Sequence, residues 1–404
     1  MKIIVDDLMP KATTFFAKLG DVVSVPGRPF AKECLNEAQA LMVRSVTPVN
    51  ADLLSDSQVK FVGTATAGMD HIDIDSLKNN NVHVTSAAGC NAIAVVEYVF
   101  SCLFYFAQKN QFNLQDKTIG IVGVGHVGSV LAKRLQILGI SVLLCDPPRK
   151  RQEIDAGKQR TEFVDFDTIL DKADIITFHT PLIKGGVDNT YHLLDKEKLS
   201  KLYRPKIIIN ASRGEVIDNS ALLVELKMGR ALSVALDVFE NEPHINVELL
   251  AYIDIATPHI AGHSLEGKLR GTTILVEKYV KFLNQIQPEY LEKQGITVLD
   301  EFESEKLLVQ YLPEALITEV TLAECLDLFS LSKLARLLYD VVEDAHQFRY
   351  QMASARTATE IATKFDALRK NYSMRREWSS LNVIAPDKSS HEQLVKLGFK
   401  TPMK

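Results

Sequence analysis

"TIGIVGVGHVGSVLAKRLQILG", residues 118–139, is the stretch of this chain that decides its fold. Its first residues are mostly apolar and β-branched, which is typical of a buried strand, and apolar residues then recur at helical spacing. Between the two patterns, Gly123, Gly125 and Gly128 have Gly-x-Gly-x-x-Gly spacing. The first glycine permits a tight turn, the second lets a pyrophosphate approach the backbone, and the third lets helix and strand pack closely. The stretch therefore predicts a dinucleotide-binding strand, turn and helix.

The pyrophosphate of a dinucleotide would lie at the N-terminus of this helix, near His126 and Val127, where backbone N–H groups and the helix dipole favour negative charge. The next predicted strand ends in Asp146, near the distance at which a carboxylate holds the ribose hydroxyls. Asp146 would repel a 2′-phosphate and therefore favours NAD over NADP, whereas Arg149 nearby favours the opposite choice. The alternative is a glycine-rich turn at a sheet edge that binds no ligand.

Short apolar runs alternate with helical patterns from residue 118 to about residue 257. The strand candidates are "TIGIVG", "SVLLCD", "DIITFHT", "KIIINAS", "LSVALDV" and "DIATP". Near-continuous apolar strands separated by helices predict a parallel sheet that is covered on both faces. The first hundred residues repeat the pattern in a smaller form, with "KIIVDD", "ALMVRS", "KFVGTAT" and "VHVTSA".

The predicted fold class is a Rossmann-type doubly wound parallel sheet inserted in a smaller flavodoxin-like α/β substrate domain, followed by a C-terminal α+β domain. A buried helix at 92–107 and a helix after His259 would carry the chain out of the first domain and back. We therefore predict a discontinuous substrate domain, an NAD-binding domain and a C-terminal domain, over residues 1–98 with 258–285, 99–257, and 286–404 respectively. The last domain is expected to contain a helix around "DLFSLSKLARLLYDVVEDAHQF", a strand in "SSLNVIA" and a final helix in "SHEQLVKLGF".

Length, charge and cysteine usage limit the class of protein. With 404 residues, the chain is long enough for two or three domains. Its 46 basic and 51 acidic residues give a net charge of −5, which argues against a nucleic-acid partner. Five scattered cysteines without a Cys-x-x-Cys pair are typical of thiols in a reducing cytoplasm, and they predict no disulfide framework and no metal site. The N-terminal "MKIIVDDLMP" is interpreted as a strand, and "AIAVVEYVFSCLFYFA" is short for a membrane span, so no membrane is expected.

Three loops that follow predicted strands carry candidate catalytic residues. They are "NASRG" with Arg213, "LDVFENEP" with Asp237 and Glu242, and "TPHIAGH" with His259. Arginine can grip a substrate carboxylate in two places. Histidine can take a hydroxyl proton as hydride leaves the same carbon, and a glutamate behind it orients the ring and stabilises the imidazolium. Each residue alone could be structural, but their order after successive strands favours a hydride-transfer site.

These blocks resemble those of the D-isomer-specific 2-hydroxyacid dehydrogenases. The resemblance extends over nearly the whole chain, through "MVRSVTPVN", "FVGTATAGMDHID" and "GCNAIAVVEYVFS" to "KFDALRKNYSMRREWSSL", which is its most specific part. It implies an NAD-dependent enzyme that oxidises a small phosphorylated 2-hydroxy acid. It also implies that Arg213, Glu242 and His259 are the catalytic set, with His259 as the proton-transfer residue. Residues 286–404 would then serve homodimerisation, with the apolar helix around Leu328–Val342 as the surface to bury.

The resemblance also assigns binding residues. NAD would contact Asp146, Thr180, Ala211, Ser212, Asp237 and Gly262, and the substrate would contact Ser45 and Thr66. Members of the family commonly have a substrate-touching tyrosine at the position of His263, so this histidine is expected to face the substrate in its place. The four-residue spacing of His259 and His263 is not interpreted as a metal site, because no Glu-x-x pattern or third ligand accompanies the pair.

A phosphorylated hydroxy acid has an anion at each end, so it needs a second site besides Arg213. Arg44 and Ser45 in "VRSVT" place a guanidinium and a hydroxyl side by side, which suits a phosphate. The alternative is that Arg44 caps a strand or pairs with a surface acid. A basic run contains Arg369, Lys370, Arg375 and Arg376, and it either adds charge to the site or forms a solvated helix face.

Two other functions stay open from the sequence. One is a different phosphorylated 2-hydroxyacid dehydrogenase, such as a phosphoglycerate-type enzyme with a regulatory C-terminal domain. The other is a non-catalytic protein that senses NAD(H) with the same fold. The block at 364–381 argues against the first, and the joint presence of Arg213, Glu242 and His259 argues against the second.

Overall fold

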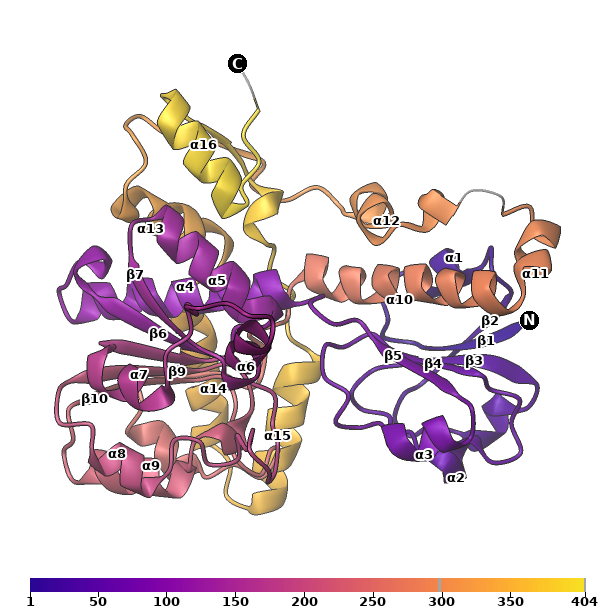
Figure 1. Ribbon diagram of the computed structural model, residues 1–404, viewed down its shortest axis with the longest axis horizontal. Helices are drawn as coiled ribbons and strands as arrows, with labels where there is room; N and C mark the ends of the chain where they lie inside the picture. The colour runs from indigo at the N-terminus through magenta and orange to yellow at the C-terminus, as the bar shows by residue number, and fades with distance from the viewer. Residues whose placement is uncertain (297–298, 403–404) are drawn as a thin grey trace. The chain divides into compact units, whose positions relative to one another are not determined.

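The computed structural model describes residues 1–296 and 299–402. The chain packs into two compact units (Figure 1), one formed by Met1–Asn91 with Ser264–Glu314 and the other by Ala92–His263 with Ala315–Lys404. The first is called the N-terminal unit below and the second the nucleotide unit. These bounds describe packing, in which residues 286–314 go with the N-terminal unit and residues 315–404 go with the nucleotide unit. The predicted division into three domains, with changes at 98, 258 and 286, stays a prediction.

The nucleotide unit is built on a six-stranded parallel sheet in the order β11-β10-β9-β8-β6-β7. Its strands are β6 (Thr118–Val122), β7 (Ser141–Cys145), β8 (Ile175–Phe178), β9 (Lys206–Asn210), β10 (Leu232–Leu236) and β11 (Ile255–Ala256). An isolated parallel bridge between Leu144 and Phe163 adds a rudimentary strand beside β7. With that bridge the strand order is 3-2-1-4-5-6-7, which contains the doubly wound dinucleotide order 3-2-1-4-5-6 with β11 as a seventh strand at one edge. The predicted Rossmann-type fold is therefore confirmed, and all six quoted strand candidates contain a strand.

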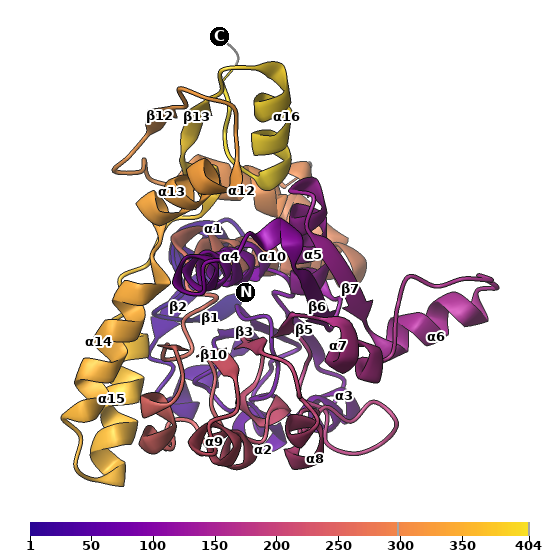
Figure 2. The same ribbon diagram turned by 90° about the vertical axis from the view of Figure 1, so that its left-hand side faces the viewer.

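Successive residues of a strand point to opposite faces of the sheet, and in these strands the residues on both faces are apolar. Helices therefore cover both faces of this sheet. Ile119 and Ile121 of β6 face one core, with α4 (Ala92–Lys109), α5 (His126–Ile137) and α13 (Leu328–Leu338). Val122 faces the other core, with α7 (Phe166–Lys172), α8 (Lys196–Ser200), α9 (Asn219–Lys227), α14 (Val341–Ala353) and α15 (Ala358–Lys370). Figure 2 shows α14 and α15 side by side along the edge of this unit. The short helix α6 (Pro147–Asp155) follows β7 and has no buried residue.

Helix α4 is the predicted buried helix. Within the described residues it is the only helix long and apolar enough to pass a membrane-span test, and 67% of its most apolar window is buried inside the structure. Its Glu97 is buried, pairs with Arg134 of α5 at 3.5 Å and accepts the backbone N–H of Trp378 at 3.0 Å. Burial raises the pKa of Glu97 to about 8, although Arg134 acts in the opposite direction. These contacts attach the C-terminal residues to α4 and α5.

The N-terminal unit has a five-stranded parallel sheet in the order β2-β1-β3-β4-β5. Its strands are β1 (Lys2–Asp6), β2 (Asp21–Val25), β3 (Ala38–Val43), β4 (Phe61–Thr64) and β5 (His83–Ser86). This is the flavodoxin-like order that was predicted. One face packs on α1 (Ala12–Phe16), the long α10 (Leu265–Ile286), α11 (Pro288–Lys293) and α12 (Ser304–Tyr311), and the other packs on α2 (Ala51–Leu54) and α3 (Ile74–Asn79) (Figure 1). Strand β2 was not predicted, because it is an edge strand whose Asp21 and Ser24 are exposed and break the apolar run.

The C-terminal residues form a parallel pair of strands, β12 (Glu319–Thr321) and β13 (Asn382–Ile384), followed by α16 (Lys388–Leu397). The predicted late strand and final helix are therefore confirmed. The single helix expected around residues 327–348 is wrong, because α13 ends at Leu338 and α14 begins at Val341. Tyr339 is extended there (φ −158°, ψ 127°), and the Asp340 carboxylate accepts the Val342 N–H at 3.0 Å, which caps a new helix. The predicted helical dimer surface Leu328–Val342 thus spans a break between two helices.

Candidate active site

The glycine loop after β6 has the backbone geometry that the motif requires. Gly123 has a φ of 89°, and a Cβ there would lie 2.7 Å from the carbonyl carbon of His179. A Cβ on Gly128 would lie 2.1 Å from the Gly123 carbonyl oxygen, so α5 packs on the loop only with glycine at this position. At Gly125 no atom lies within 4 Å of a Cβ position. Two glycines are therefore required by close packing, and the third faces open space.

This open space fits a dinucleotide pyrophosphate. Helix α5 begins at His126 and Val127 and has no side-chain cap, so a ligand can accept its first backbone N–H groups. Beside the loop, the Thr180 hydroxyl is buried and has no hydrogen-bond partner within residues 1–296 and 299–402. A buried hydroxyl without a partner is costly, and a bound cofactor would satisfy it.

Asp146 ends β7 and closes the other side of the glycine loop. Its Oδ2 accepts the Val124 N–H at 2.8 Å, and its Oδ1 accepts the Arg149 N–H at 3.1 Å, which caps α6. Each carboxylate oxygen keeps a lone pair for a ribose hydroxyl. The Arg149 side chain donates to the Val124 carbonyl oxygen and stacks on the Phe163 ring at 5.0 Å. The loop, the helix end and the carboxylate are therefore all present for an NAD adenosine.

The two residues predicted as the catalytic histidine and glutamate are in direct contact. His259 Nδ1 lies 2.7 Å from Glu242 Oε2, and Glu242 Oε1 accepts the Phe239 N–H at 2.9 Å. Burial alone would raise the pKa of Glu242, but the charge and hydrogen bond of His259 and the Phe239 N–H lower it overall. The carboxylate therefore stays ionised behind the ring, and Nε2 is the nitrogen left for a substrate hydroxyl.

The loop that carries His259 is held by the carboxylate of Asp237, which is only 1% exposed. Its Oδ1 accepts the Thr257 hydroxyl at 2.7 Å and the Ile260 N–H at 2.8 Å, and its Oδ2 accepts the Ala261 N–H at 2.9 Å. Burial raises the pKa of Asp237, with His259 and these hydrogen bonds acting against the rise. His259 itself has a φ of 57°, which side chains other than glycine seldom adopt without support from their surroundings. Asp237 thus organises the catalytic loop, and its predicted contact with NAD stays a prediction.

Arg213 lies in a second ordered loop, after β9. The buried Asn210 accepts the backbone N–H of Ser212 at 3.1 Å and its hydroxyl at 2.9 Å, and it donates to the Arg213 carbonyl oxygen at 2.9 Å. The guanidinium of Arg213 donates to the Ser212 carbonyl oxygen at 2.8 Å. Ala211 and Ser212 form the loop backbone, with the Ser212 hydroxyl turned towards Asn210. No role was predicted for Asn210, and its place at the end of a strand was the only available signal.

Sheet order brings the predicted residues of the nucleotide unit to one edge. Strands β9, β10 and β11 are neighbours, so the loops that carry Arg213, Asp237 with Glu242, and His259 are neighbours at their carboxyl ends. The glycine loop and Thr180 follow β6 and β8, between which the strand order reverses and where ligands of such folds bind. Gly262 and His263 follow directly after the catalytic loop. The ring of His263 lies 5.9 Å from that of Tyr372, a residue for which no role was predicted.

Arg44, Ser45 and Thr66 belong to the N-terminal unit. Arg44 and Ser45 follow β3, and the strand order of this sheet reverses between β1 and β3. The Thr66 hydroxyl bonds the Thr64 hydroxyl at 2.7 Å and donates to the Gly68 carbonyl oxygen at 3.0 Å. Lys268 of α10 was missed by sequence reasoning. Burial and the positive charge of Arg44 lower the pKa of Lys268 to about 8, so two cations face one another at this sheet edge.

The chain was compared with proteins of known family. Residues 105–261 match the model of the D-isomer specific 2-hydroxyacid dehydrogenase NAD-binding domain, and residues 311–398 match a domain of unknown function (DUF3410). Erythronate-4-phosphate dehydrogenase from Proteus mirabilis is 49% identical over 404 residues, which is 100% of each chain. The enzyme of that name from Escherichia coli is 49% identical over 399 residues, or 99% of this chain and 98% of that one. The chain belongs to the erythronate-4-phosphate dehydrogenase family.

Solved structures confirm the fold of this family member. D-Lactate dehydrogenase from Aquifex aeolicus, solved with NAD and lactic acid, aligns with a TM-score of 0.55 at 22% identity over 72% of this chain and 98% of that one. NAD⁺-bound 3-phosphoglycerate dehydrogenase from Entamoeba histolytica aligns with a TM-score of 0.58 at 23% identity over 70% of this chain and 95% of that one. At these identities the alignments support the fold, whereas the matched NAD-binding domain supports the cofactor.

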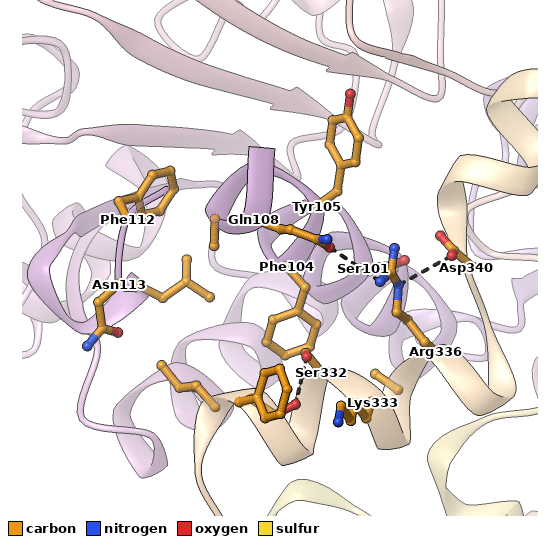
Figure 3. A pocket seen from close by; sticks show the side chains of 15 residues that line it. Ser101, Phe104, Tyr105, Gln108, Phe112, Asn113, Ser332, Lys333, Arg336 and Asp340 are labelled. Carbon is orange, nitrogen blue, oxygen red and sulfur yellow. Dashed lines mark hydrogen bonds and ion pairs between the residues drawn. The ribbon is translucent and has the colours of Figure 1, made fainter. Parts of the chain in front are cut away.

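Two other features of the nucleotide unit involve residues that were not predicted as site residues. A pocket of about 380 Å³ is lined by α4, α13 and the segment after α4 (Figure 3). Arg336 lies in it, with Gln108 at 3.3 Å and Asp340 at 3.3 Å. His192, Asp218 and Glu240 form the one cluster with metal-ligand spacing among residues 1–296 and 299–402. The two carboxylates of this cluster also accept backbone N–H groups at the start of α9, which gives them a structural role.

Replacement of Asp146 is expected to weaken NAD binding. Asp146→Ala should lower NAD affinity roughly ten- to a hundredfold, because a charged hydrogen-bond acceptor contributes about 1.5–3 kcal/mol. It should also narrow the preference for NAD over NADP, because the negative charge that repels a 2′-phosphate is lost. Calorimetric titration of both cofactors measures these changes. Asp165→Ala, which removes a surface partner of Lys150, serves as the control and should change neither affinity. Tighter binding of NADP than of NAD by the parent protein would contradict the assignment.

Proposed function

We propose that this protein oxidises 4-phospho-D-erythronate to 2-oxo-3-hydroxy-4-phosphobutanoate with NAD, in the biosynthesis of pyridoxal 5′-phosphate (vitamin B6). The observation that carries the proposal is the His259–Glu242 contact of 2.7 Å at the carboxyl edge of a dinucleotide-binding sheet. The relatives named erythronate-4-phosphate dehydrogenase support the choice of substrate, since their similarity covers the full chain. Such an enzyme is expected in the cytoplasm, where NAD is available.

The proposed reaction breaks the C–H bond of carbon 2 and the O–H bond of the hydroxyl group on that carbon. Arg213 binds the adjacent carboxylate in two places and so orients carbon 2. His259 Nε2 takes the hydroxyl proton, while the hydrogen on carbon 2 leaves with its electron pair and the C–O bond becomes a carbonyl. NAD, when bound, supplies the acceptor for that hydride. Glu242 stabilises the imidazolium through Nδ1, and this stabilisation increases as the ring gains the proton and its positive charge.

The two rival functions are less well supported. A phosphoglycerate-type enzyme fits the fold, but the chain is 49% identical over its whole length to proteins with a different name. A protein that only senses NAD(H) needs no proton acceptor, yet the His259–Glu242 pair is formed and its loop is held by Asp237 through three hydrogen bonds. An ordered acid–base pair of this kind favours turnover over binding alone.

Loss of the catalytic pair is expected to slow turnover while NAD binding is retained. His259→Ala should lower kcat by about 10²–10⁴-fold, the range of general acid–base assistance. Glu242→Gln should lower kcat less, because the ring keeps a hydrogen-bond partner but loses the stabilising charge. Steady-state NADH absorbance gives kcat, and calorimetry gives NAD affinity. The exposed His244 offers a matched control, since His244→Ala should leave both unchanged. Near-parental kcat in His259→Ala would contradict the role of this histidine.

For the other end of the substrate, we propose that Arg44 and Ser45 bind the phosphate, with Thr66 as a further substrate contact and His263 facing the substrate near the catalytic loop. Lys268 is added to this set because its pKa is lowered to about 8 by burial and by Arg44. The positive charges of Arg44 and Lys268 repel one another, and a dianionic phosphate relieves that repulsion. Asp6 lies nearby at the end of β1, where burial raises the pKa of its carboxyl despite Arg44.

Variants of this cation pair are expected to lose recognition of the phosphate. Arg44→Ala should raise KM for 4-phosphoerythronate roughly ten- to a hundredfold, since hydrogen bonds to charged groups contribute about 1.5–3 kcal/mol. KM for unphosphorylated erythronate and NAD affinity should stay near the parental values. Lys281→Met is the control, since it removes an exposed cation of α10, the helix that carries Lys268. An unchanged ratio of the two KM values would place the phosphate elsewhere.

The lowered pKa of Lys268 adds a pH dependence with a definite sign. Lys268 carries its charge below pH of about 8 and loses it as the pH rises through that value. Phosphate binding in the free enzyme should therefore weaken above this pH, and KM for the phosphorylated substrate should rise. In Lys268→Met the KM for the phosphorylated substrate should be higher than in the parent at pH 7, and it should no longer rise above a pH of about 8. A KM profile with the same alkaline rise in the variant would contradict the assignment.

We further propose that the protein is a homodimer and that the C-terminal residues supply its interface. Helix α13 leaves Phe329 66% and Leu337 47% exposed, and the pocket beside α4 (Figure 3) adds further apolar surface. Large exposed apolar side chains on one helix favour a protein contact. Phe329→Glu should therefore shift the protein from dimer to monomer in sedimentation velocity. Tyr203→Glu, at an exposed side chain of the nucleotide unit, is the control and should leave the dimer intact. A Phe329→Glu protein that is fully dimeric would exclude α13 from the interface.

A further inference from the structure

Arg375 is the buried member of the basic run at residues 369–376. It lies between α15 and β13 and is only 7% exposed, so the interpretation of this run as a solvated helix face is wrong at this position. Its guanidinium donates to the carbonyl oxygens of Ile260 at 3.2 Å, Ala94 at 2.9 Å and Ala261. Two of these acceptors belong to the loop that carries His259. The C-terminal residues therefore contact the catalytic loop directly.

The loop is held from two sides by opposite charges. Asp237 accepts the backbone N–H groups of Ile260 and Ala261, and Arg375 donates to the carbonyl oxygens of the same two residues. Both polar groups of each residue are thus bonded to a buried ionised side chain. Hydrogen bonds to ionised groups are about twice as strong as neutral ones, and both charged groups come from outside the loop. Because His259 has a φ of 57°, its conformation depends on such external support.

Aromatic rings fix the guanidinium in place. The ring of Tyr339 lies 4.0 Å from Arg375, at the break between α13 and α14. Tyr372 donates to Asp344 Oδ2 at 2.7 Å, and its ring lies 5.9 Å from that of His263. Burial alone would lower the pKa of Arg375, but Tyr339, Tyr372 and Asp344 raise it overall. The guanidinium therefore remains charged, with a planar geometry that suits several carbonyl oxygens at once.

We propose that Arg375 is a positioning residue that fixes the catalytic loop, so that residues 315–404 take part in catalysis as well as in assembly. The inference rests on the proposed function, because it assigns to Arg375 the placement of His259 as the proton acceptor. Displacement of a reacting group by about 1 Å can lower the rate roughly a hundredfold, and we expect loss of Arg375 to lower kcat by up to that factor. The matched domain of unknown function at residues 311–398 would then have a defined role in the chemistry of the enzyme.

The kinetic experiment compares Arg375→Met and Arg375→Lys in the full-length protein. Arg375→Met should lower kcat roughly ten- to a hundredfold, with KM for 4-phosphoerythronate and NAD affinity within about twofold of the parent. Arg375→Lys should recover part of kcat, because an ammonium keeps the charge but cannot reach all three carbonyl oxygens. Lys370→Met removes an exposed cation of the same run and should have no effect. Parental kcat in a folded Arg375→Met protein would overturn the proposal.

Amide hydrogen exchange tests the same proposal without turnover. The peptide that contains residues 258–263 should exchange faster in Arg375→Met and Arg375→Lys than in the parent. Leu394→Ala destabilises α16, where Leu394 is fully buried, and should lower the melting temperature without faster exchange of this peptide or a lower kcat. Unchanged loop exchange in both Arg375 variants would overturn the positioning role. If Arg375→Met does not fold, Arg375→Lys decides by the same two measurements.

The two proposals fail in different ways. Failure of the proposed function would appear as no formation of NADH from 4-phosphoerythronate by the parent protein, whatever the loop exchange of the Arg375 variants. Failure of the present inference would appear as unchanged loop exchange in the Arg375 variants, while His259→Ala is still impaired.

Discussion

The buried carboxylate of Asp237 is the group on which the rest of the active site depends. Its two oxygens take one hydroxyl and two backbone N–H groups from a single turn, and that turn puts His259 within 2.7 Å of Glu242. A buried charge is costly unless it is fully hydrogen-bonded, so the carboxylate and the loop stabilise one another. Thr257 extends this network to α4, since its hydroxyl also lies 2.8 Å from that of Tyr98.

The parallel sheet gives this network its position. All strands of the six-stranded sheet point the same way, so every loop at their carboxyl ends lies on one edge. The glycine loop, Thr180, Arg213 and His259 are far apart in sequence and reach that edge from different strands. Strand order then places the residues proposed to bind the cofactor at the reversal between β6 and β8, and the residues proposed for catalysis beside it, after β9, β10 and β11. The residues proposed for catalysis and those proposed for cofactor binding are adjacent because both follow strands of the same parallel sheet.

Much of this could be predicted from the sequence because the information is local. Strand and helix patterns over residues 118–257 gave the six strands, and Gly128 is required by its contact with Gly123 in the same turn. Glu242 and His259 were chosen by chemical type and by their place after a strand, and the structure brings them into contact. Prediction failed where a neighbour overrides the local pattern. The apolar repeat around residue 339 continues through a helix break, and β2 lacks a clear apolar run because it is an edge strand.

The sequence by itself determined the parallel sheets, the glycine loop and the types of catalytic side chain, since periodicity and turn chemistry are properties of short segments. Only the tertiary structure decided which polar groups hold them in place. Asn210 orders the Arg213 loop, Lys268 faces Arg44, and Arg375 reaches Ile260 across 115 positions of sequence. The pairings of Lys268 and of Arg375 join residues far apart in the chain, so no sequence spacing could reveal them. Each arises because a buried charge or amide must find its hydrogen-bond partners in the folded chain, wherever in the sequence those partners lie.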